Sequence, residues 1–446
     1  MDTTVFDERN LVKQFQEDNI QRFQKFVKDY DAYMSPILRA QGYQLKNTVS
    51  RTVLFTFGEV EFFRNRWYKN GQCKIPVDEK LGLKKHERFS RELLYQAAHL
   101  STYLPYRKVG DVLELVNQTV VSKDTVLKAV KKGKKLLEAK EDYDYYHETQ
   151  NSSIQNATTI YVEGDGVMVK TTDSQEDNWN TDLAHFVVHT GSEQVGPQRF
   201  RLQQKKEFIS IKNSKAREKL LDYLYYNFEI TEQTQLICNS DGGHGYTYYI
   251  FNELAQALGI RHVEYFWDSY HLYEKIHQYF SPYPSEVEEL AIKAVKQHHR
   301  KELVTAFDTV ESLIEDDQEL EKLLHFKHQL LARFAYTKPA KFRGVSHQGI
   351  GIMESQHRKI TYRMKHRGMY WSLEGADTMS QIIILREEGS LRELFMGGWQ
   401  HTYQKLTKQY SSAHEWIAYN PEHQGFWRPK EKLKIKRVIK RMRLKR

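Results

Sequence analysis

Residues 160–169, with the sequence IYVEGDGVMV, are the strongest indicator of the architecture, because strand formers at 160–162 and 167–169 flank the acidic and glycine residues 163–166. On the carboxyl side of this segment, hydrophobic patterning predicts further elements. These are strands at 185–189 and 208–211, a helix at 214–227, a strand at 235–238, a helix at 246–258 and a strand at 262–267. Three strands followed by helix, strand, helix and strand are typical of an α/β domain with a mixed sheet.

The composition indicates a globular protein of several domains. The chain has 446 residues, enough for two to four domains at roughly 150 residues each. Hydrophobic residues make up 40% and aromatic residues 13%, which excludes a disordered chain. The mean hydropathy of −0.71 and the polar residues 1–10 predict neither a membrane span nor a signal peptide. Two distant cysteines, Cys73 and Cys238, favour a reducing compartment and exclude a thiolate-rich zinc finger.

The positive charge is concentrated at the carboxyl end. The chain carries 67 basic and 58 acidic residues, a net charge of +9. Residues 429–446 contain ten Lys or Arg and one acid, so the rest of the chain has 57 of each sign and is neutral. A basic tail on a neutral body favours nucleic-acid binding, with a solvated or membrane-surface tail as the alternative. The tail residues expected to contact DNA are Lys436, Arg437, Lys440, Arg441 and Arg443.

The amino-terminal part combines a helix with a small sheet. Residues 7–34 have apolar side chains at helical spacing and predict an amphipathic helix. Residues 51–77 are rich in strand formers, and Asn70-Gly71 is a tight-turn signal, so a small antiparallel sheet is expected. The basic residues of this sheet either contact phosphate or protect a solvated sheet edge. They are Arg51, Arg64, Arg66 and Lys69.

Two helices separated by a short turn are predicted next, at 106–116 and 123–135, with Ser122 capping the second. The side chains of the second helix expected to face the core are Val126, Leu127 and Val130. Its outer face is basic, with Lys123, Lys128, Lys131, Lys132, Lys134 and Lys135. This arrangement fits a helix-turn-helix that contacts DNA through Lys123 and Lys128, although a plain helical hairpin has the same pattern.

Two aspartates lie where an α/β sheet gathers its ligands. Asp165 lies between glycines in a strand segment, and Asp241 ends an apolar strand just before two glycines. Ligand sites in open α/β sheets form at the carboxyl ends of strands, and glycine lets a bulky backbone such as nucleic acid come close. The alternative is that both are turn aspartates, because aspartate favours turns for conformational reasons.

Glu354 is the third acidic candidate and lies on a helix expected over 350–369. Helical spacing places it on one face with Arg358 and Lys365. Carboxylates with basic groups beside them suit metal-assisted phosphodiester chemistry, because Mg²⁺ takes oxygen ligands and paired ions stabilise the attacking and leaving oxygens. An ordinary surface pair between Glu354 and Arg358 is the alternative.

Asp268 and His271 open a predicted helix just after a strand. His271 could orient a ligand or a phosphate, whereas Asp268 could be only a helix N-cap. Other chemistries fit poorly, since the sequence has no Gly-x-x-x-x-Gly-Lys-Ser/Thr phosphate loop and no Gly-x-Ser-x-Gly nucleophile elbow. Neither cysteine has a motif that marks a nucleophile.

Taken in order, these motifs resemble those of bacterial insertion-sequence transposases of the ISLre type, long catalogued as an uncharacterised protein family. The motifs are YVEGDG at 161–166, NSDG at 239–242, WDSYH at 267–271 and ESQHR at 354–358, continued by MKHRGMYWSLEGA at 364–376. The resemblance covers nearly the whole chain and implies a ribonuclease-H-like core. Asp165 on the first core strand, Asp241 on the fourth and Glu354 on the final helix would form an Asp/Asp/Glu triad that binds two Mg²⁺ or Mn²⁺ ions.

The resemblance also implies the activity and the partners. The reaction would be phosphodiester hydrolysis at the element end, then attack of the freed 3′-hydroxyl on target DNA. Arg358 and Lys365 would hold phosphates, the helix-turn-helix would recognise the terminal inverted repeat, and the tail would add affinity that falls with salt. The implied partners are double-stranded DNA and a second copy in a synaptic dimer, in the bacterial cytoplasm at the nucleoid and away from membranes. The alternatives are a transposase-derived DNA-binding regulator without catalysis and another ribonuclease-H-like nuclease.

The gaps of 76 and 113 residues between the three acids resemble Mutator-like relatives, which carry a helical insertion before the glutamate and an element like the Asp268/His271 pair. On this basis we expect eight segments. They are an N-terminal helical region at 1–50, a small antiparallel β element at 51–83, a helical region with the helix-turn-helix at 84–141, a linker at 142–158, the first part of the core at 159–284, a helical insertion at 285–345, the last part of the core with C-terminal helices at 346–428 and the basic tail at 429–446.

Overall fold

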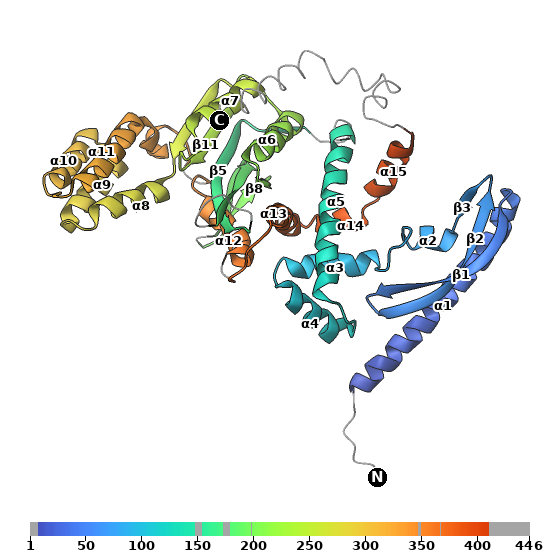
Figure 1. Ribbon diagram of the computed structural model, residues 1–446. Helices are drawn as coiled ribbons and strands as arrows, with labels where there is room; N and C mark the ends of the chain where they lie inside the picture. Colours follow the sequence, from blue (N-terminus) through green and yellow to red (C-terminus); the bar gives the residue numbers. More distant parts are fainter. Residues whose placement is uncertain are drawn as a thin grey trace, which may run out of the picture. The chain divides into compact units, whose positions relative to one another are not determined.

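The computed structural model describes residues 8–147, 154–172, 179–197, 199–346, 349–365 and 367–409 (Figure 1). The chain divides into two compact units, the first built from Met1–Asp144 and Ile382–Gln409 and the second containing Tyr145–Gln381. Each unit has its own buried hydrophobic core. Among the helices in these ranges, none is long and apolar enough to cross a membrane.

The first unit begins with a helix packed on a small sheet. The elements are α1 (Glu8–Ala40) and the antiparallel strands β1 (Gln44–Phe55), β2 (Gly58–Lys69) and β3 (Gln72–Lys74), in the order β1-β2-β3. The predicted turn at Asn70-Gly71 is confirmed, with φ of 49° and 78° at the two residues. The sheet begins at Gln44 instead of the predicted residue 51, because residues 44–48 are exposed and carry no hydrophobic pattern.

Helices complete the first unit. They are α2 (Pro76–Lys80), α3 (Arg91–Ser101), α4 (Tyr106–Asn117), α5 (Lys123–His147), α14 (Leu391–Met396) and α15 (Trp399–Gln409). The two helices predicted around Ser122 are confirmed as α4 and α5, and the Ser122 Oγ accepts the Thr125 N–H at 3.3 Å. A Cβ at Gly110 would lie 2.4 Å from the carbonyl oxygen of Val121, so glycine lets α4 approach the chain just before α5.

The inward face of α5 differs from the prediction at one position. Val126 and Val130 are buried, but Leu127 is 37% exposed. Thr125, Val126, Ala129 and Val130 are all buried, and at about 100° per residue they define a face whose centre lies about 130° from Leu127. Ala129, which is fully buried, occupies the place expected for Leu127.

The second unit is built on a five-stranded mixed sheet. Its strands are β5 (Thr159–Lys170), β6 (Asn180–His189), β9 (Lys206–Ser210), β11 (Gln235–Ser240) and β12 (His262–Trp267), in the order β12-β11-β5-β6-β9. β5, β6 and β9 are antiparallel, whereas β11 and β12 run parallel to β5. Two smaller pairs are β4 (Gln155–Asn156) with β10 (Phe228–Glu229), and β7 (Gly191–Gly196) with β8 (Arg199–Gln203). The predicted mixed α/β architecture is therefore confirmed.

β5 is one continuous strand through residues 163–166, which agrees with the prediction of a single strand segment around Asp165. Gly164 lies within this strand because its neighbour on β6 leaves no room for a side chain. A Cβ at this position would lie 2.6 Å from the ring of Phe186 on β6, so glycine lets the buried ring pack against the backbone of β5.

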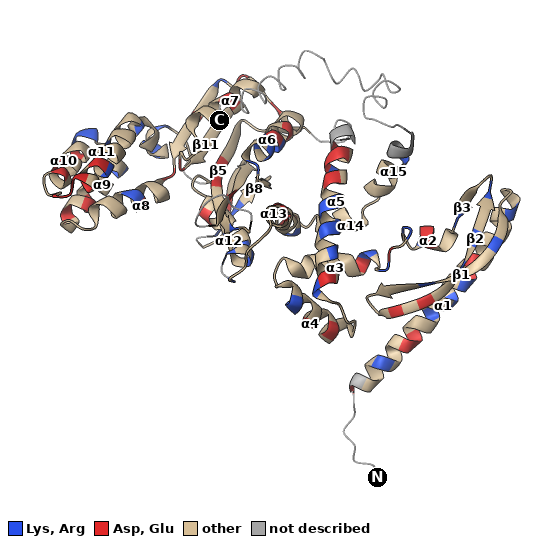
Figure 2. Ribbon diagram, viewed as in Figure 1, with Lys and Arg blue, Asp and Glu red and all other residues tan. Residues whose placement is uncertain are grey.

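The second unit also contains two groups of helices. α6 (Asn213–Asn227) and α7 (Tyr248–Leu258) share its core through residues such as Leu220 and Phe251. α8 (Ser269–Phe280), α9 (Ser285–Gln297), α10 (Arg300–Glu311) and α11 (Asp317–Ala332) pack around a core of their own, and two short 3₁₀ turns follow at Phe334–Thr337 and Ala340–Phe342 (Figure 1). The all-helical stretch predicted at 285–335 is confirmed, and both acidic and basic residues occur along its helices (Figure 2).

α12 (Met353–Met364) is the helix that carries Glu354, and it packs against β5. It is shorter than the predicted 350–369 because left-handed glycines lie on both sides, Gly351 with φ of 78° and Gly368 with φ of 60°. α13 (Leu373–Glu387) follows, and its Asp377 carboxylate accepts the Ser210 hydroxyl at 2.9 Å beyond the end of β9.

Candidate functional site

Asp165 and Asp241 come together on neighbouring parallel strands. β5 and β11 pair with Gly164 opposite Ser240, so each aspartate is the next residue along its strand direction. Burial raises the pKa of Asp241, and the negative charge of Asp165 raises it further. The Gly243 N–H, which donates to Oδ1 of Asp241 at 2.8 Å, has the opposite effect and lowers this pKa. The two aspartates therefore lie within electrostatic range of each other where β11 ends.

Two histidines lie beside Asp165. Its Oδ2 is 3.4 Å from Nε2 of His271 and 3.8 Å from Nδ1 of His357. Burial alone would raise the pKa of Asp165, but the contacts with both histidines lower it below its usual range. The contact with Asp165 raises the pKa of His271 to about 9, so His271 is a cation at neutral pH. Burial lowers the pKa of His357 to about 4, and His357 is neutral.

Asp268 caps α8, as the more conservative interpretation of the sequence predicts. Its Oδ1 accepts the N–H groups of Tyr270 at 2.9 Å and His271 at 3.2 Å. Its Oδ2 accepts the side-chain N–H of Asn239 at 2.9 Å, so the cap is also tied to β11. Asp268 thus orients the first turn of α8, which is the turn that carries His271 to Asp165.

Asp182 is an acidic neighbour that the sequence interpretation missed. It lies on β6 opposite Met168, and its Oδ2 accepts the hydroxyl of Tyr246 at 3.0 Å. Burial raises the pKa of Asp182, and the charges of Asp165 and Asp241 raise it further. Its Oδ1 is buried without a hydrogen-bond partner among the described residues. The prediction begins this strand at 185, so the polar residues at its start gave no strand signal.

Glu354 lies in the first turn of α12 and is exposed. Because α12 packs against β5, and His357 one turn further on lies beside Asp165, this helix is docked next to the two aspartates. The structure does not assemble the three acids into one ligand group: across the described ranges, no set of three His, Cys, Asp or Glu side chains is arranged to hold a metal ion.

A buried carboxylate and a buried amide connect the site, and the sequence interpretation assigned neither. Glu163, two residues before Asp165, is 1% exposed, and Asn239, two residues before Asp241, is 2% exposed. The Glu163 carboxylate accepts the backbone N–H groups of Gly351 and Ile352, at 2.9 Å and 3.0 Å, just before α12. The Asn239 amide donates to it at 3.1 Å. Both residues are polar and lie inside otherwise apolar strands. This could have indicated a hydrogen-bonding role, since buried polar groups need partners.

The predicted DNA-binding residues are distributed over both units. Arg358 and Lys365 are exposed on and just after α12. Lys123 and Lys128 are exposed on α5 in the first unit, where the Lys128 ammonium also lies 5.6 Å from the ring centre of Phe89. The five predicted tail residues lie outside the described residues.

Two of the four basic residues in the small sheet are committed to an internal ion pair. The guanidinium groups of Arg51 and Arg64 lie 2.7 Å and 2.9 Å from the carboxylate of Asp78, and both side chains are largely buried. Arg66 donates to the hydroxyl of Tyr68, and Lys69 donates to the Gln41 carbonyl. For Arg51 and Arg64, the structure favours a structural role over phosphate contact.

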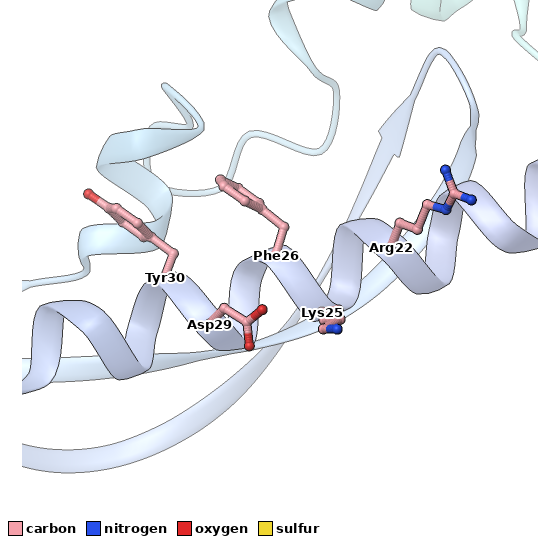
Figure 3. A pocket seen from close by; sticks show the side chains of 5 residues that line it. All are labelled: Arg22, Lys25, Phe26, Asp29 and Tyr30. Atoms are coloured by element: carbon pink, nitrogen blue, oxygen red, sulfur yellow. The ribbon is translucent and has the colours of Figure 1, made fainter.

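A shallow hollow of about 420 Å³ lies on the surface of α1 and does not belong to this site (Figure 3). It is lined by Arg22, Lys25, Phe26, Asp29 and Tyr30. The rings of Phe26 and Tyr30 stack with their centres 6.2 Å apart and form its apolar part. Neither Asp165 nor Asp241 lines it.

The described residues thus define a mixed α/β protein with a carboxylate and histidine site where β11 ends beside the middle of the parallel strand β5. The chain belongs to the uncharacterised protein family UPF0236, whose model matches residues 6–400. It is 31% identical to the UPF0236 protein in the vanSb 3′ region of Streptococcus gallolyticus over 353 residues, which cover 78% of this chain and 75% of that protein. The strand transfer complex of the Drosophila P element transposase matches 71% of this chain and 83% of its own, at 10% identity and a TM-score of 0.25, a likeness too slight to define a shared fold.

Proposed function

We propose that this chain is a DNA transposase of an insertion sequence, which binds the element ends and catalyses metal-dependent phosphodiester cleavage and strand transfer. The observation that carries this proposal is the meeting of Asp165 and Asp241 on β5 and β11, with the helix that bears Glu354 packed on β5. In chain order, β5 is the first strand of the sheet and β11 the fourth. These are the places that a ribonuclease-H-like core of the ISLre type and its Mutator-like relatives would give to its two aspartates.

The donor set suits a divalent cation. Asp165, Asp182 and Asp241 are carboxylates close enough to influence one another, and burial and mutual repulsion raise the pKa of the latter two. A cation with oxygen preference, such as Mg²⁺ or Mn²⁺, would relieve this repulsion. Asp165 and Asp241 would hold such ions, and Glu354 would complete the triad. When bound, two ions of this kind activate the attacking oxygen and stabilise the leaving oxygen.

The neighbouring groups have separate roles in this proposal. His271, a cation beside Asp165, would offset part of the negative charge that DNA and the carboxylates bring together. The exposed Arg358 and Lys365 would hold phosphates of the cleaved strand. In the first unit, α4 and α5 would act as a helix-turn-helix that recognises the terminal inverted repeat through Lys123 and Lys128. The basic tail would add sequence-independent affinity, in a bacterial nucleoid-associated protein that works as a dimer.

The test is cleavage of labelled DNA that carries the ends of the encoding element, with Mg²⁺ or Mn²⁺ and target DNA. Wild type is compared with Asp241→Asn and with a matched control, Glu264→Gln. Glu264 lies on β12 and pairs with Arg343 at 3.1 Å, and among the described residues it has no hydrogen bond or ion pair with Asp165, Asp182 or Asp241. We expect metal-dependent cleavage and joined products with wild type and with the control, and neither with Asp241→Asn.

The other outcomes point to other functions. Specific binding of the element ends without cleavage by wild type would indicate a DNA-binding regulator derived from a transposase. Cleavage without joined products would indicate another nuclease with the same core. Equal cleavage by wild type and Asp241→Asn would contradict the proposed site.

A further inference from the structure

The start of α12 is held by a single buried carboxylate. Glu163 uses both oxygens: Oε1 accepts the Gly351 N–H at 2.9 Å, and Oε2 accepts the Ile352 N–H at 3.0 Å. The Asn239 amide also donates to Oε2, at 3.1 Å. The two backbone donors lie immediately before Met353, the first residue of α12. Glu163 therefore fixes where the helix that carries Glu354 begins.

The same network reaches the other elements of the site. The Asn239 side-chain nitrogen donates both to Glu163 and, at 2.9 Å, to Oδ2 of Asp268. Asp268 caps α8 and so orients His271, which contacts Asp165. One chain of hydrogen bonds thus links β5, β11, α8 and α12, the four elements that carry the proposed site residues.

Burying a carboxylate costs free energy unless hydrogen bonds offset the loss of its hydration. A buried glutamate at this position therefore indicates a role for its hydrogen bonds. An apolar residue could fill the space inside the sheet but could not bind two adjacent backbone N–H groups. Three donors and the positive end of a helix offset part of that cost here. Burial, together with the charge of Asp268, still raises the pKa of Glu163 to about 8. The arrangement therefore favours a residue whose role is to set the position of a loop and a helix, beyond filling the core.

We propose that Glu163 and Asn239 are positioning residues that hold the first turn of α12, and with it Glu354, at the level of Asp165 and Asp241. This inference rests on the proposed function, because it assigns the network to the geometry of that site. Neither residue contacts the reacting groups; each acts through the backbone and through Asp268.

If the hydrogen bonds to Glu163 are lost, α12 is still held to the sheet by contacts in its middle. In the middle of α12, the Lys359 ammonium donates to Oε1 of Glu207 at 2.6 Å, and Glu207 also pairs with the buried His185 at 3.0 Å. The rings of His185 and His357 stack with centres 5.4 Å apart. The effect of losing Glu163 is therefore confined to the first turn of α12 and the residues before it.

The experiment compares the full-length wild type with Glu163→Gln, which replaces one acceptor oxygen by a donor and leaves a backbone N–H facing an NH₂ group. Asn239→Ala is the second variant, for the case that Glu163→Gln does not fold, and Glu264→Gln is the control. The first readout is hydrogen exchange of the backbone amides over residues 349–356. The second is the Mn²⁺ concentration that gives half-maximal cleavage of element-end DNA.

We expect the amide hydrogens of Gly351 and Ile352 to exchange at least about tenfold faster in Glu163→Gln, which loses an acceptor for them. Asn239→Ala keeps both acceptor oxygens but frees the Glu163 side chain from β11, so the same amides should exchange faster by a smaller factor. Exchange over residues 359–364 should be unchanged in both variants. The half-saturating Mn²⁺ concentration should rise by about ten- to 100-fold, the range found when supporting partners of metal ligands are removed. DNA affinity should stay the same, and the control should match wild type throughout. Unchanged exchange at 349–356, or faster exchange with an unchanged Mn²⁺ requirement, would overturn the positioning role.

The two readouts separate this inference from the proposed function. If wild type cleaves no DNA with any divalent ion, the proposed function fails. The cleavage assay is then replaced by a Mn²⁺ titration in which hydrogen exchange of the backbone amides of residues 349–356 is measured. In that titration, Mn²⁺ should slow exchange at 349–356 in wild type at lower concentration than in Glu163→Gln. The same Mn²⁺ concentration in both proteins would contradict the inference.

Discussion

The acids on the strands and the acid on the helix are held in different ways. Asp165 lies on β5 and Asp241 directly follows β11, and the backbone pairing of the two strands up to Gly164 and Ser240 fixes where both residues lie. Glu354 lies in the first turn of α12, whose position depends on a few side-chain contacts from Glu163, His189 and Glu207. In the proposed site, the strands would therefore supply two rigidly held carboxylates, and the helix would supply a third whose position depends on these side-chain contacts.

The largest effect on cleavage should come from removing one carboxylate, either from the strands (Asp241) or from the helix (Glu354). Asp241→Asn and Glu354→Gln should each lower metal-dependent cleavage by about 1,000-fold, the range found when one group that stabilises a developing charge is lost. Their effects on stability should differ. Asp241→Asn should raise the thermal midpoint of the metal-free protein, because it removes a buried charge repelled by Asp165, whereas exposed Glu354→Gln should leave it unchanged. Full cleavage by Glu354→Gln would exclude α12 from the site.

A pH-dependent effect should follow from the loop before α12. The buried His189 ring donates from Nε2 to the Gly349 carbonyl at 3.0 Å and accepts the Gly191 N–H at Nδ1, at 3.2 Å. Burial lowers the pKa of His189 from 6.5 to about 4, so the unfolded chain binds the proton first as the pH falls. The free energy of unfolding should therefore be complete above pH 6.5 and should fall by about 3 kcal/mol towards pH 4.

The control for that prediction is His189→Gln, which stays neutral at every pH. Chemical denaturation of both proteins between pH 4 and pH 7 measures the difference. The substituted protein should lose less stability over this interval than wild type. Parallel pH profiles would show that His189 is not the group responsible.

A smaller effect should follow from releasing the middle of α12. Lys359→Met keeps the aliphatic part of the side chain but removes the hydrogen bond to Glu207, which retains its contacts with His185 and Lys205. We expect a loss of about 1.5 kcal/mol in the free energy of unfolding, typical of a hydrogen bond to a charged group. Urea denaturation measures it, and exchange at residues 349–356 should stay at the wild-type rate. Faster exchange there would mean that the two anchors of α12 are coupled.

The smallest effect concerns DNA recognition away from the acidic site. Replacing Lys123 and Lys128 together by Glu should weaken binding to the element ends several-fold more than binding to random DNA, because base contacts depend on sequence and phosphate contacts do not. Competition binding at fixed salt measures both affinities. An equal loss on both DNAs would refute sequence recognition by α5, and cleavage of prebound DNA should remain at the wild-type rate.

Much of the fold can be predicted from local patterns. The strand at 262–267 and the helix capped by Asp268 agree with the structure, because an apolar run and a capping residue leave clear local signals. The polar starts of β1 and β6 escape prediction, since exposed or acidic residues carry no hydrophobic period. Asp182 lies in the polar start of β6, so its place beside the other two aspartates could not be predicted for the same reason.

The sequence by itself determines the mixed α/β class, the acidic candidates Asp165 and Asp241 and the concentration of basic charge in residues 429–446, because composition, periodicity and turn chemistry are local properties. Only the tertiary structure decides that Asp165 lies beside Asp241 and His271, and that Glu163 binds the start of α12 from 188 residues away. Such pairings depend on strand order and register, which arise from packing the whole sheet and cannot be inferred from any single segment.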